Sequence, residues 1–470
     1  MKMSKLGLSL QKLVQKFSLF SLIFLLSSCS DVDESKLIHA KEPEAGVVYD
    51  SAVRYVNSMR YEAGLNSLNT NPNLEISSAN HAKYLAQNDI ISHNEQPNLS
   101  GFTGANPSER GFFAGYNSQI SENVSSGQKD EIASTNDLMS AIYHRFGFLD
   151  MSIDEIGFLS QLGASGRYFV FNMGNSRLNE FCSHLKSDEG YGKFLTGLCK
   201  NRSLAIGAEH YEKLLKFSNA NYVQFPIGDN VQTYFNEEIP DPLPECKITS
   251  NPVSIEFARN YGDIKFKDFA IFKDSKRLDD TILLNKRNDP NLILNERQFA
   301  LFSRKVFDYD SEYRAKFDYE KEGEAHTIEW KFRTQTPYRP YFVVRDGKIL
   351  GANSNQSQAQ ISDSFLMMEA GREYEIYFYP RNCNDVLEKY SVSYSFTKKP
   401  EITMIGANFI RIKIDGLKGQ IVKFKPQNGE EIKIYLTSTK NYTLFTAQNL
   451  AVLGGILLLF CFFIYKFRRQ

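Results

Sequence analysis

The sequence carries no excess of charge of either sign: 55 Lys and Arg residues balance 55 Asp and Glu residues in a chain of 470. Binding to nucleic acid is driven by an excess of Lys and Arg, so this balance argues against nucleic acid as a partner. The sequence also lacks a Walker motif, a dinucleotide-binding glycine motif, an HExxH motif and a recognisable Ser or Cys nucleophile. These absences exclude the enzyme classes that such motifs identify.

Tryptophan is scarce as well: the chain contains one Trp, compared with 36 Phe and 25 Tyr residues. Phe and Tyr favour β-strands, so much β-structure is expected. Apolar residues make up 42% of the chain, which is enough for well-packed cores. A chain of this length exceeds one ordinary domain and indicates about two to four.

The first 28 residues have the features of a secretory signal peptide. A lysine-rich start precedes an apolar run from Phe17 to Leu26 that is too short to span a bilayer. The run ends in Leu26-Ser27-Ser28-Cys29, which resembles a bacterial lipobox, where the Cys thiol is lipidated. We predict a lipoprotein with its lipid on Cys29 and a polar tether over residues 29–45. An ordinary signal peptide with a chance Cys is the alternative.

The C-terminal segment 444–465 is almost entirely apolar and long enough, at about 1.5 Å per residue, to cross a bilayer of about 30 Å. Basic residues follow directly, which places the C-terminus in the cytoplasm under the positive-inside rule. We predict a transmembrane helix over 444–465. The membrane is then a partner, and the protein belongs to the cell envelope, with its ectodomain in the periplasm or outside the cell. A processed sorting signal around Gly454-Gly455 is the alternative.

Six cysteines divide into two groups by position. Cys29 is the lipidation candidate, and Cys461 lies in the apolar C-terminal segment. The other four cysteines are an even number, as expected for disulfide pairs in an oxidising compartment. No spacing among them suggests a zinc module. Three pairings are possible, and the preferred one joins Cys182 to Cys199 and Cys246 to Cys383.

The ectodomain changes its hydrophobic period along its length. Helical spacing prevails from residue 47 to about residue 148. A connector over 177–245 ends in Pro240-Asp241-Pro242-Leu243-Pro244, which is typical of a stiff, extended linker. After the connector, apolar residues recur at every second position, as in segment 253–257, which is typical of β-strands. We predict an Ig-like β domain over 246–336 and a second β domain over 337–440.

Several short motifs in the helical region occur in a specific order. They are Arg60–Leu68 (RYEAGLNSL), Asn71–Leu74 (NPNL), His81–Leu85 (HAKYL), Ser92-His93 and Ser121–Val124 (SENV). Together they resemble the bacterial branch of the CAP superfamily, which includes cysteine-rich secretory proteins, antigen 5 and pathogenesis-related 1 proteins. The resemblance covers residues 46–176 and implies an α-β-α sandwich. The expected fold class is thus α+β: a CAP-type sandwich, then Ig-like β-sandwich domains and a C-terminal transmembrane helix.

The same resemblance implies a cleft that contains two His and two acidic residues. His93 matches the first family His, Glu122 the first Glu, and His144 the His of a bacterial segment. The later family His is replaced by Arg167, and the second acid has no match. We therefore predict a binding cleft formed by His93, Glu122 and His144.

Two imidazoles and a carboxylate could hold a divalent metal such as zinc, and the same three residues are the candidate ligands. They could also act as general acid and base near neutral pH. Alternatively, His93 and Glu122 only fasten a loop to a helix. His81 lies in the middle of a predicted helix and is expected to be structural.

Three functions are compatible with these features. We predict a non-enzymatic binding module for a lipid, a peptide or a glycan. The first alternative is a metal-assisted hydrolase that acts on peptides or cell-wall material. The second is a structural envelope protein with a vestigial cleft.

Overall fold

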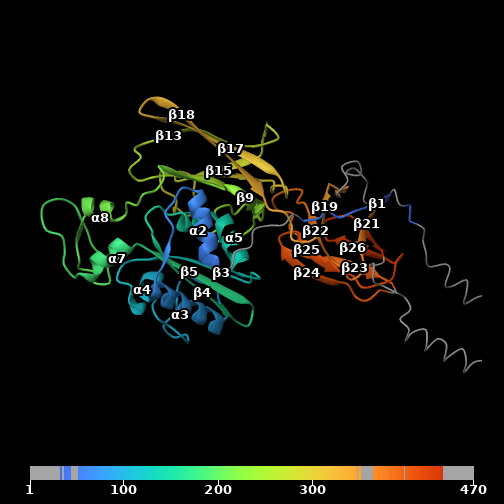
Figure 1. The fold of residues 1–470 in the computed structure, drawn as a ribbon, viewed down its shortest axis with the longest axis horizontal. Helices are drawn as coiled ribbons and strands as arrows, with labels where there is room; N and C mark the ends of the chain where they lie inside the picture. Colours follow the sequence, from blue (N-terminus) through green and yellow to red (C-terminus); the bar gives the residue numbers. More distant parts are fainter. Residues whose placement is uncertain are drawn as a thin grey trace, which may run out of the picture. The chain divides into compact units, whose positions relative to one another are not determined.

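The computed structural model describes residues 32–33, 36–43, 51–346, 348–350, 364–395 and 397–437. The chain divides into two compact units, both drawn in Figure 1. Unit 1 contains Met1–Pro43, Arg339–Tyr379 and Leu387–Gln470, and unit 2 contains Glu44–Tyr338 and Pro380–Val386. The predicted signal peptide and Cys29 lie outside the described residues.

Unit 2 begins with a four-stranded sheet of order β2-β4-β5-β3, covered by helices. Its elements, in chain order, are α2 (Ala52–Glu62), β2 (Asn69–Thr70), α3 (Pro72–Asn88), α4 (Pro107–Ala114), β3 (Ser121–Ser126), α5 (Glu131–Ser140), α6 (Ile142–Phe148), β4 (Glu155–Leu162) and β5 (Arg167–Gly174). The start of α3 follows from its sequence: the Asn71 side chain caps the helix by accepting from the Asn73 and Leu74 backbone N–H groups, and Pro72 occupies the first turn.

The sheet is a middle layer because β5 is apolar on both faces. Phe169 and Phe171 pack in a core that includes residues of α2, α5 and α6. Tyr168 and Val170 point to the opposite face, where they pack against α3. The result is an α-β-α sandwich, as expected from the motifs (Figure 1).

A small disulfide-bonded subdomain follows. It contains α7 (Ser176–Ser183), β6 (Phe194–Leu195), β7 (Ile206–Gly207) and α8 (Ala208–Leu214). The Cys182–Cys199 disulfide lies in its core, and a second disulfide joins Cys246 to Cys383. The preferred pairing of the four cysteines is therefore confirmed.

Unit 2 continues with two facing sheets. The first has the order β15-β16-β12-β8 and the second the order β14-β13-β17-β18-β9. Both contribute to one core, which contains the single Trp, Trp330. The strands are β8 (Tyr222–Phe225), β9 (Gly228–Val231), β12 (Val253–Phe257), β13 (Lys265–Lys273), β14 (Lys276–Arg277), β15 (Thr281–Asn285), β16 (Gln298–Ser303), β17 (Glu312–Lys321) and β18 (Glu324–Thr334). β8 and β9 come from the segment predicted as a connector, so this β-sandwich starts earlier than residue 246.

Unit 1 is also a two-sheet sandwich, with strand orders β1-β21-β27-β26-β23 and β20-β19-β22-β25-β24. Its strands are β1 (Leu37–Ile38), β19 (Tyr341–Arg345), β20 (Lys348–Leu350), β21 (Phe365–Glu369), β22 (Glu373–Phe378), β23 (Tyr390–Tyr394), β24 (Glu401–Gly406), β25 (Phe409–Lys413), β26 (Ile421–Pro426) and β27 (Ile432–Thr437). β1 pairs with β21 in parallel, Leu37 opposite Phe365. Part of the segment predicted as a tether thus belongs to this sandwich.

The predicted fold class is wrong in its last element, the transmembrane helix. Within residues 32–437, apart from the gaps given above, no helix is both long enough and apolar enough to cross a membrane. For example, the 17-residue helix α3 contains Glu75 and Lys83 and packs against the sheet of unit 2. The segment 444–465, on which the prediction rested, lies outside the described residues. The α+β part of the prediction agrees with the observed elements.

Candidate functional site

His93 and Glu122 form the first half of the candidate site. His93 lies in the loop after α3, and its Nδ1 is 3.0 Å from Oε1 of Glu122 on β3. The Glu122 side chain is fully buried, whereas 40% of the His93 side chain is exposed. An ionised carboxylate only accepts hydrogen bonds, so Nδ1 of His93 is the donor and Nε2 carries the free lone pair.

Glu122 is ionised because a buried cation lies beside it. Nη2 of Arg110, on α4, donates to both carboxylate oxygens at 2.7 and 2.8 Å, and neither side chain is exposed. Burial alone would raise the pKa of Glu122, but Arg110, His81 and His93 together lower it below its usual value. With its amide oriented to satisfy its neighbours, Asn172 of β5 also donates to Glu122, at 3.0 Å.

His81 supports the loop that carries His93. Its Nδ1 is 2.9 Å from Oε1 of Glu95, and its Nε2 is 2.9 Å from the carbonyl oxygen of Ser92. Glu95 in turn accepts the backbone N–H of Thr103 at 2.7 Å. His81 and Glu95 are completely buried. His81 thus fastens the loop on both sides of His93, which is the structural role expected from its position in the sequence.

His144 forms the second half of the site, at the start of α6. Its ring lies 5.8 Å from the ring of His93, centroid to centroid, with an angle of 26° between the planes. Its Nδ1 is 2.7 Å from Oε1 of Glu238, which also accepts the backbone N–H groups of Tyr143 and His144. No side chain at the N-cap position Ala141 caps α6, so Glu238 takes over this function.

Three residues of the site were not predicted from the sequence: Glu238, Arg110 and Glu95. Glu238 is the carboxylate nearest in role to the second family acid, but it lies 94 residues after His144 and outside the region of resemblance. No spacing in the sequence connects Glu238 to His144. Arg110 gave no signal, since nothing in the motif pattern requires a cation beside Glu122.

The trio His93, Glu122 and His144 was also the predicted metal site. In the part of the chain that the structure describes, no group of three or more His, Cys, Asp or Glu side chains could hold a metal ion. Arg110 already compensates the charge of Glu122, and Nδ1 of each His faces a carboxylate. The arrangement therefore does not fit a zinc ion held by all three side chains.

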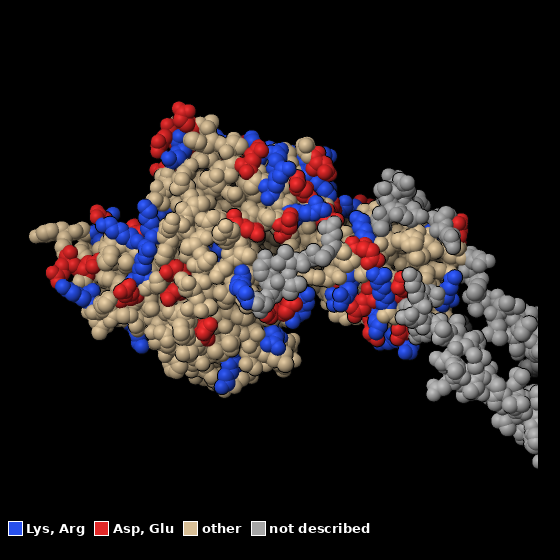
Figure 2. All heavy atoms as spheres, in the orientation of Figure 1, with Lys and Arg blue, Asp and Glu red and all other residues tan. Residues whose placement is uncertain are grey.

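The site instead presents two neighbouring imidazole edges. Each Nδ1 is fixed by a carboxylate, which leaves each Nε2 to interact with a ligand. The His144 side chain is 12% exposed and that of His93 more so, which makes the pair reachable from solvent. Charges of both signs are interspersed over the face of the molecule shown in Figure 2.

Comparison with known proteins supports the motif-based interpretation. Residues 53–173 match the model of the cysteine-rich secretory protein (CAP) family. Similar solved structures include an outer surface protein of Borrelia burgdorferi, with 20% identity over 26% of this chain and 87% of that one, and a TM-score of 0.23. An extracellular protein with an SCP domain from Bacillus anthracis is 17% identical over 27% of this chain and 44% of that one, with a TM-score of 0.23.

Proteins with Ig domains are also among the similar solved structures. A tandem of titin Ig domains is 8% identical over 45% of this chain and 93% of that one, with a TM-score of 0.15. A comparison with curated proteins gives no match.

Proposed function

Because residues 53–173 form a domain of the cysteine-rich secretory protein family, we propose that this chain is an extracytoplasmic binding protein of the bacterial envelope. Its CAP cleft holds a lipid head group, a peptide or a glycan without turning it over. The observation that carries the proposal is the pair of neighbouring imidazoles, His93 and His144, each with its Nδ1 fixed by a buried carboxylate.

The chemistry of this pair favours ligand recognition. Two fixed Nε2 lone pairs can accept hydrogen bonds from two hydroxyl or amide donors on one ligand. The carboxylates need no rearrangement when the ligand arrives, because both are already buried and hydrogen-bonded. Such a preorganised site loses little free energy in ordering its own side chains.

Hydrolysis is the second candidate function, and the same hydrogen bonds favour it. An imidazole whose Nδ1 donates to a carboxylate can take a proton at Nε2 and act as a general base. Against this, Glu122 already shares its charge with Arg110, and the site offers no set of metal ligands among the residues described. Binding therefore remains the preferred function.

The compartment follows from the disulfides and from the N-terminal sequence. Two disulfides indicate an oxidising space outside the cytoplasm. We propose that the signal peptide is removed and that Cys29 is lipidated. Cys29→Ser should then move the protein from the membrane fraction to the soluble extracytoplasmic fraction, and equal membrane retention of both forms would contradict the lipid anchor.

The functional test compares His93→Ala and His144→Ala with wild type in the full chain. His184→Ala serves as a control, because that His is 71% exposed and outside the cleft. Binding is measured against phospholipid vesicles, a peptide library and envelope glycans, and turnover is measured on the same peptides and glycans.

Loss of binding in both cleft variants, with an unchanged melting temperature, supports the proposal. Loss of turnover would instead identify a hydrolase. If wild type binds none of the probes, or if the cleft variants bind as wild type does, the cleft is not the ligand site and a structural role replaces the proposal.

A further inference from the structure

A second candidate site lies elsewhere in unit 2, where the CAP domain, the disulfide-bonded subdomain and the first β-sandwich meet. A cavity of about 640 Å³ is lined by residues of three segments: 150–152, 212–221 and 256–260, together with Phe146 and residues 295–298. Neither His93 nor His144 lines it. Its volume falls within the range of about 300–1,000 Å³ that is typical of small-molecule sites.

Five primary amides belong to the polar lining of this cavity, beside seven charged side chains. Each amide both donates and accepts hydrogen bonds. Carboxylates and cations are mixed around the same cavity, for example Asp150 and Glu212 with Lys216 and Arg297. The amides are Asn219, Asn221, Asn260, Asn295 and Gln298.

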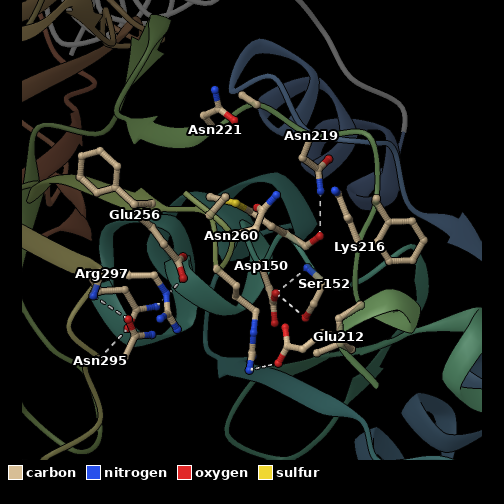
Figure 3. A pocket seen from close by; sticks show the side chains of 18 of the residues that line it. Asp150, Ser152, Glu212, Lys216, Asn219, Asn221, Glu256, Asn260, Asn295 and Arg297 are labelled. Carbon is tan, nitrogen blue, oxygen red and sulfur yellow. Dashed lines mark hydrogen bonds and ion pairs between the residues drawn. The ribbon is translucent and has the colours of Figure 1, made fainter. Parts of the chain in front are cut away.

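Several of these side chains make the walls rigid. Asn219 accepts the backbone N–H of Asn66 at 2.8 Å and donates to the carbonyl oxygen of Met151 at 2.7 Å. Arg259 and Glu212 bridge two of the segments at 3.1 Å. Figure 3 shows Asp150, Asn219 and Glu256 around the cavity, each from a different one of the three segments. The cavity is therefore built by long-range contacts and does not depend on one mobile loop.

Other polar atoms of the lining have no internal partner. Oε2 of Glu256 and Nε of Arg297 are buried and make no hydrogen bond within the described parts of the chain. Oε1 of Glu256, in contrast, accepts from Gln298 at 3.1 Å. Both unpaired atoms are covered within the wall, so they are not direct contacts for a ligand in the cavity.

Glu256 acts as a donor near neutral pH. Burial, followed by the negative charge of Asp150, raises the pKa of Glu256 to about 8, although Gln298, Arg297 and Arg259 oppose the shift. A protonated carboxyl donates one hydrogen bond and accepts others. At neutral pH, Glu256 therefore adds no negative charge to the lining.

We propose that this cavity is a second binding site, separate from the imidazole pair, and that it takes a neutral polyhydroxylated ligand, a sugar or short glycan. Hydroxyl groups donate and accept hydrogen bonds at the same atom, which matches a lining of amides. Phe217, which is half-buried, also lines the cavity and offers apolar surface to the C–H face of a sugar. A strongly anionic ligand would meet Asp150 and Glu212, and a polyamine would meet Lys216 and Arg297.

The test uses the full chain with glucose, N-acetylglucosamine and their short β-linked oligomers as probes, measured by titration calorimetry. The variant is Asn221→Ala with Asn260→Ala, because both side chains are exposed and make no hydrogen bond in the described structure. Gln161→Ala is the matched control, since it removes an exposed amide of β4 that does not line the cavity.

We expect wild type and Gln161→Ala to bind at least one probe with equal affinity, and the double variant to bind it at least tenfold more weakly with an unchanged melting temperature. His93→Ala should leave sugar binding intact, which separates this site from the CAP cleft. The inference is overturned if no probe binds, if the double variant binds as wild type does, or if His93→Ala alone abolishes sugar binding.

Discussion

Replacement of Arg110 tests the buried charges of the CAP cleft directly. Arg110→Met keeps a side chain of similar length but removes the cation from Glu122, and both groups are fully buried. Removal of one partner of a buried ion pair typically costs about 3–5 kcal/mol, because the remaining charge is uncompensated. We therefore expect Arg110→Met to reduce the free energy of unfolding by about 3–5 kcal/mol at pH 8.

The pH dependence should reverse between wild type and variant. In wild type the pKa of Glu122 is lowered, so its contribution to stability is present above the unfolded-state pKa and is lost as the pH falls. Without Arg110, burial is opposed by the two histidines and the hydrogen bond from Asn172 but by no permanent cation, so the pKa of Glu122 rises. Its protonated form is then favoured in the folded state, so the variant gains stability relative to wild type as the pH falls from 8 to 5.

The assay is urea unfolding followed by circular dichroism at pH 8 and pH 5. The control is Arg110→Met combined with Glu122→Gln, which removes both charges and should be more stable than the single variant at pH 8. The reasoning is refuted if Arg110→Met costs less than about 1 kcal/mol, if its cost is equal at both pH values, or if the double variant is no more stable than the single one.

Two further predictions concern chain connectivity and packing. From loop entropy, loss of the Cys246–Cys383 disulfide, with a sequence separation of 137, should lower the free energy of unfolding by about 5 kcal/mol. Loss of Cys182–Cys199, with a separation of 17, should lower it by about 3 kcal/mol. Urea unfolding of the two paired Cys→Ser variants checks this order, and the reverse order would contradict it. A Cβ added at Gly157 would lie 2.1 Å from the backbone carbonyl carbon of Leu74, so Gly157→Ala should lower the free energy of unfolding by at least about 3 kcal/mol. The control is Gly207→Ala, whose Cβ meets only ordinary contacts and which should keep the wild-type melting temperature within a few degrees.

Local signals in the sequence predicted local structure well. Asn71-Pro72 specified the start of α3, because a capping amide and a proline are both favourable in a first helical turn. The apolar run 168–171 became the central strand β5, since it is flanked by Gly166 and Gly174 and is buried on both faces. The motif order located the CAP domain, which the family match at 53–173 confirms.

Long-range partners could not be predicted in this way. β8 and β9 carry only short alternating patterns, and their place in the sandwich depends on β12 and β18, which follow much later in the chain. Glu238 completes the site of His144 from outside the CAP domain, and no spacing rule connects the two residues. The amide-lined cavity depends on three segments that have no common motif.

The pairing of β1 with β21 has a consequence for the order in which the protein folds. Leu37 leaves the ribosome early, yet its partner Phe365 lies 328 residues later (365 − 37). During synthesis, the chain for nearly all of unit 2 is therefore available before the sandwich of unit 1 can close. Until β21 and β27 have been made, the short strand Leu37–Ile38 lacks its partners, and unit 1 closes only when the C-terminal part of the chain has emerged.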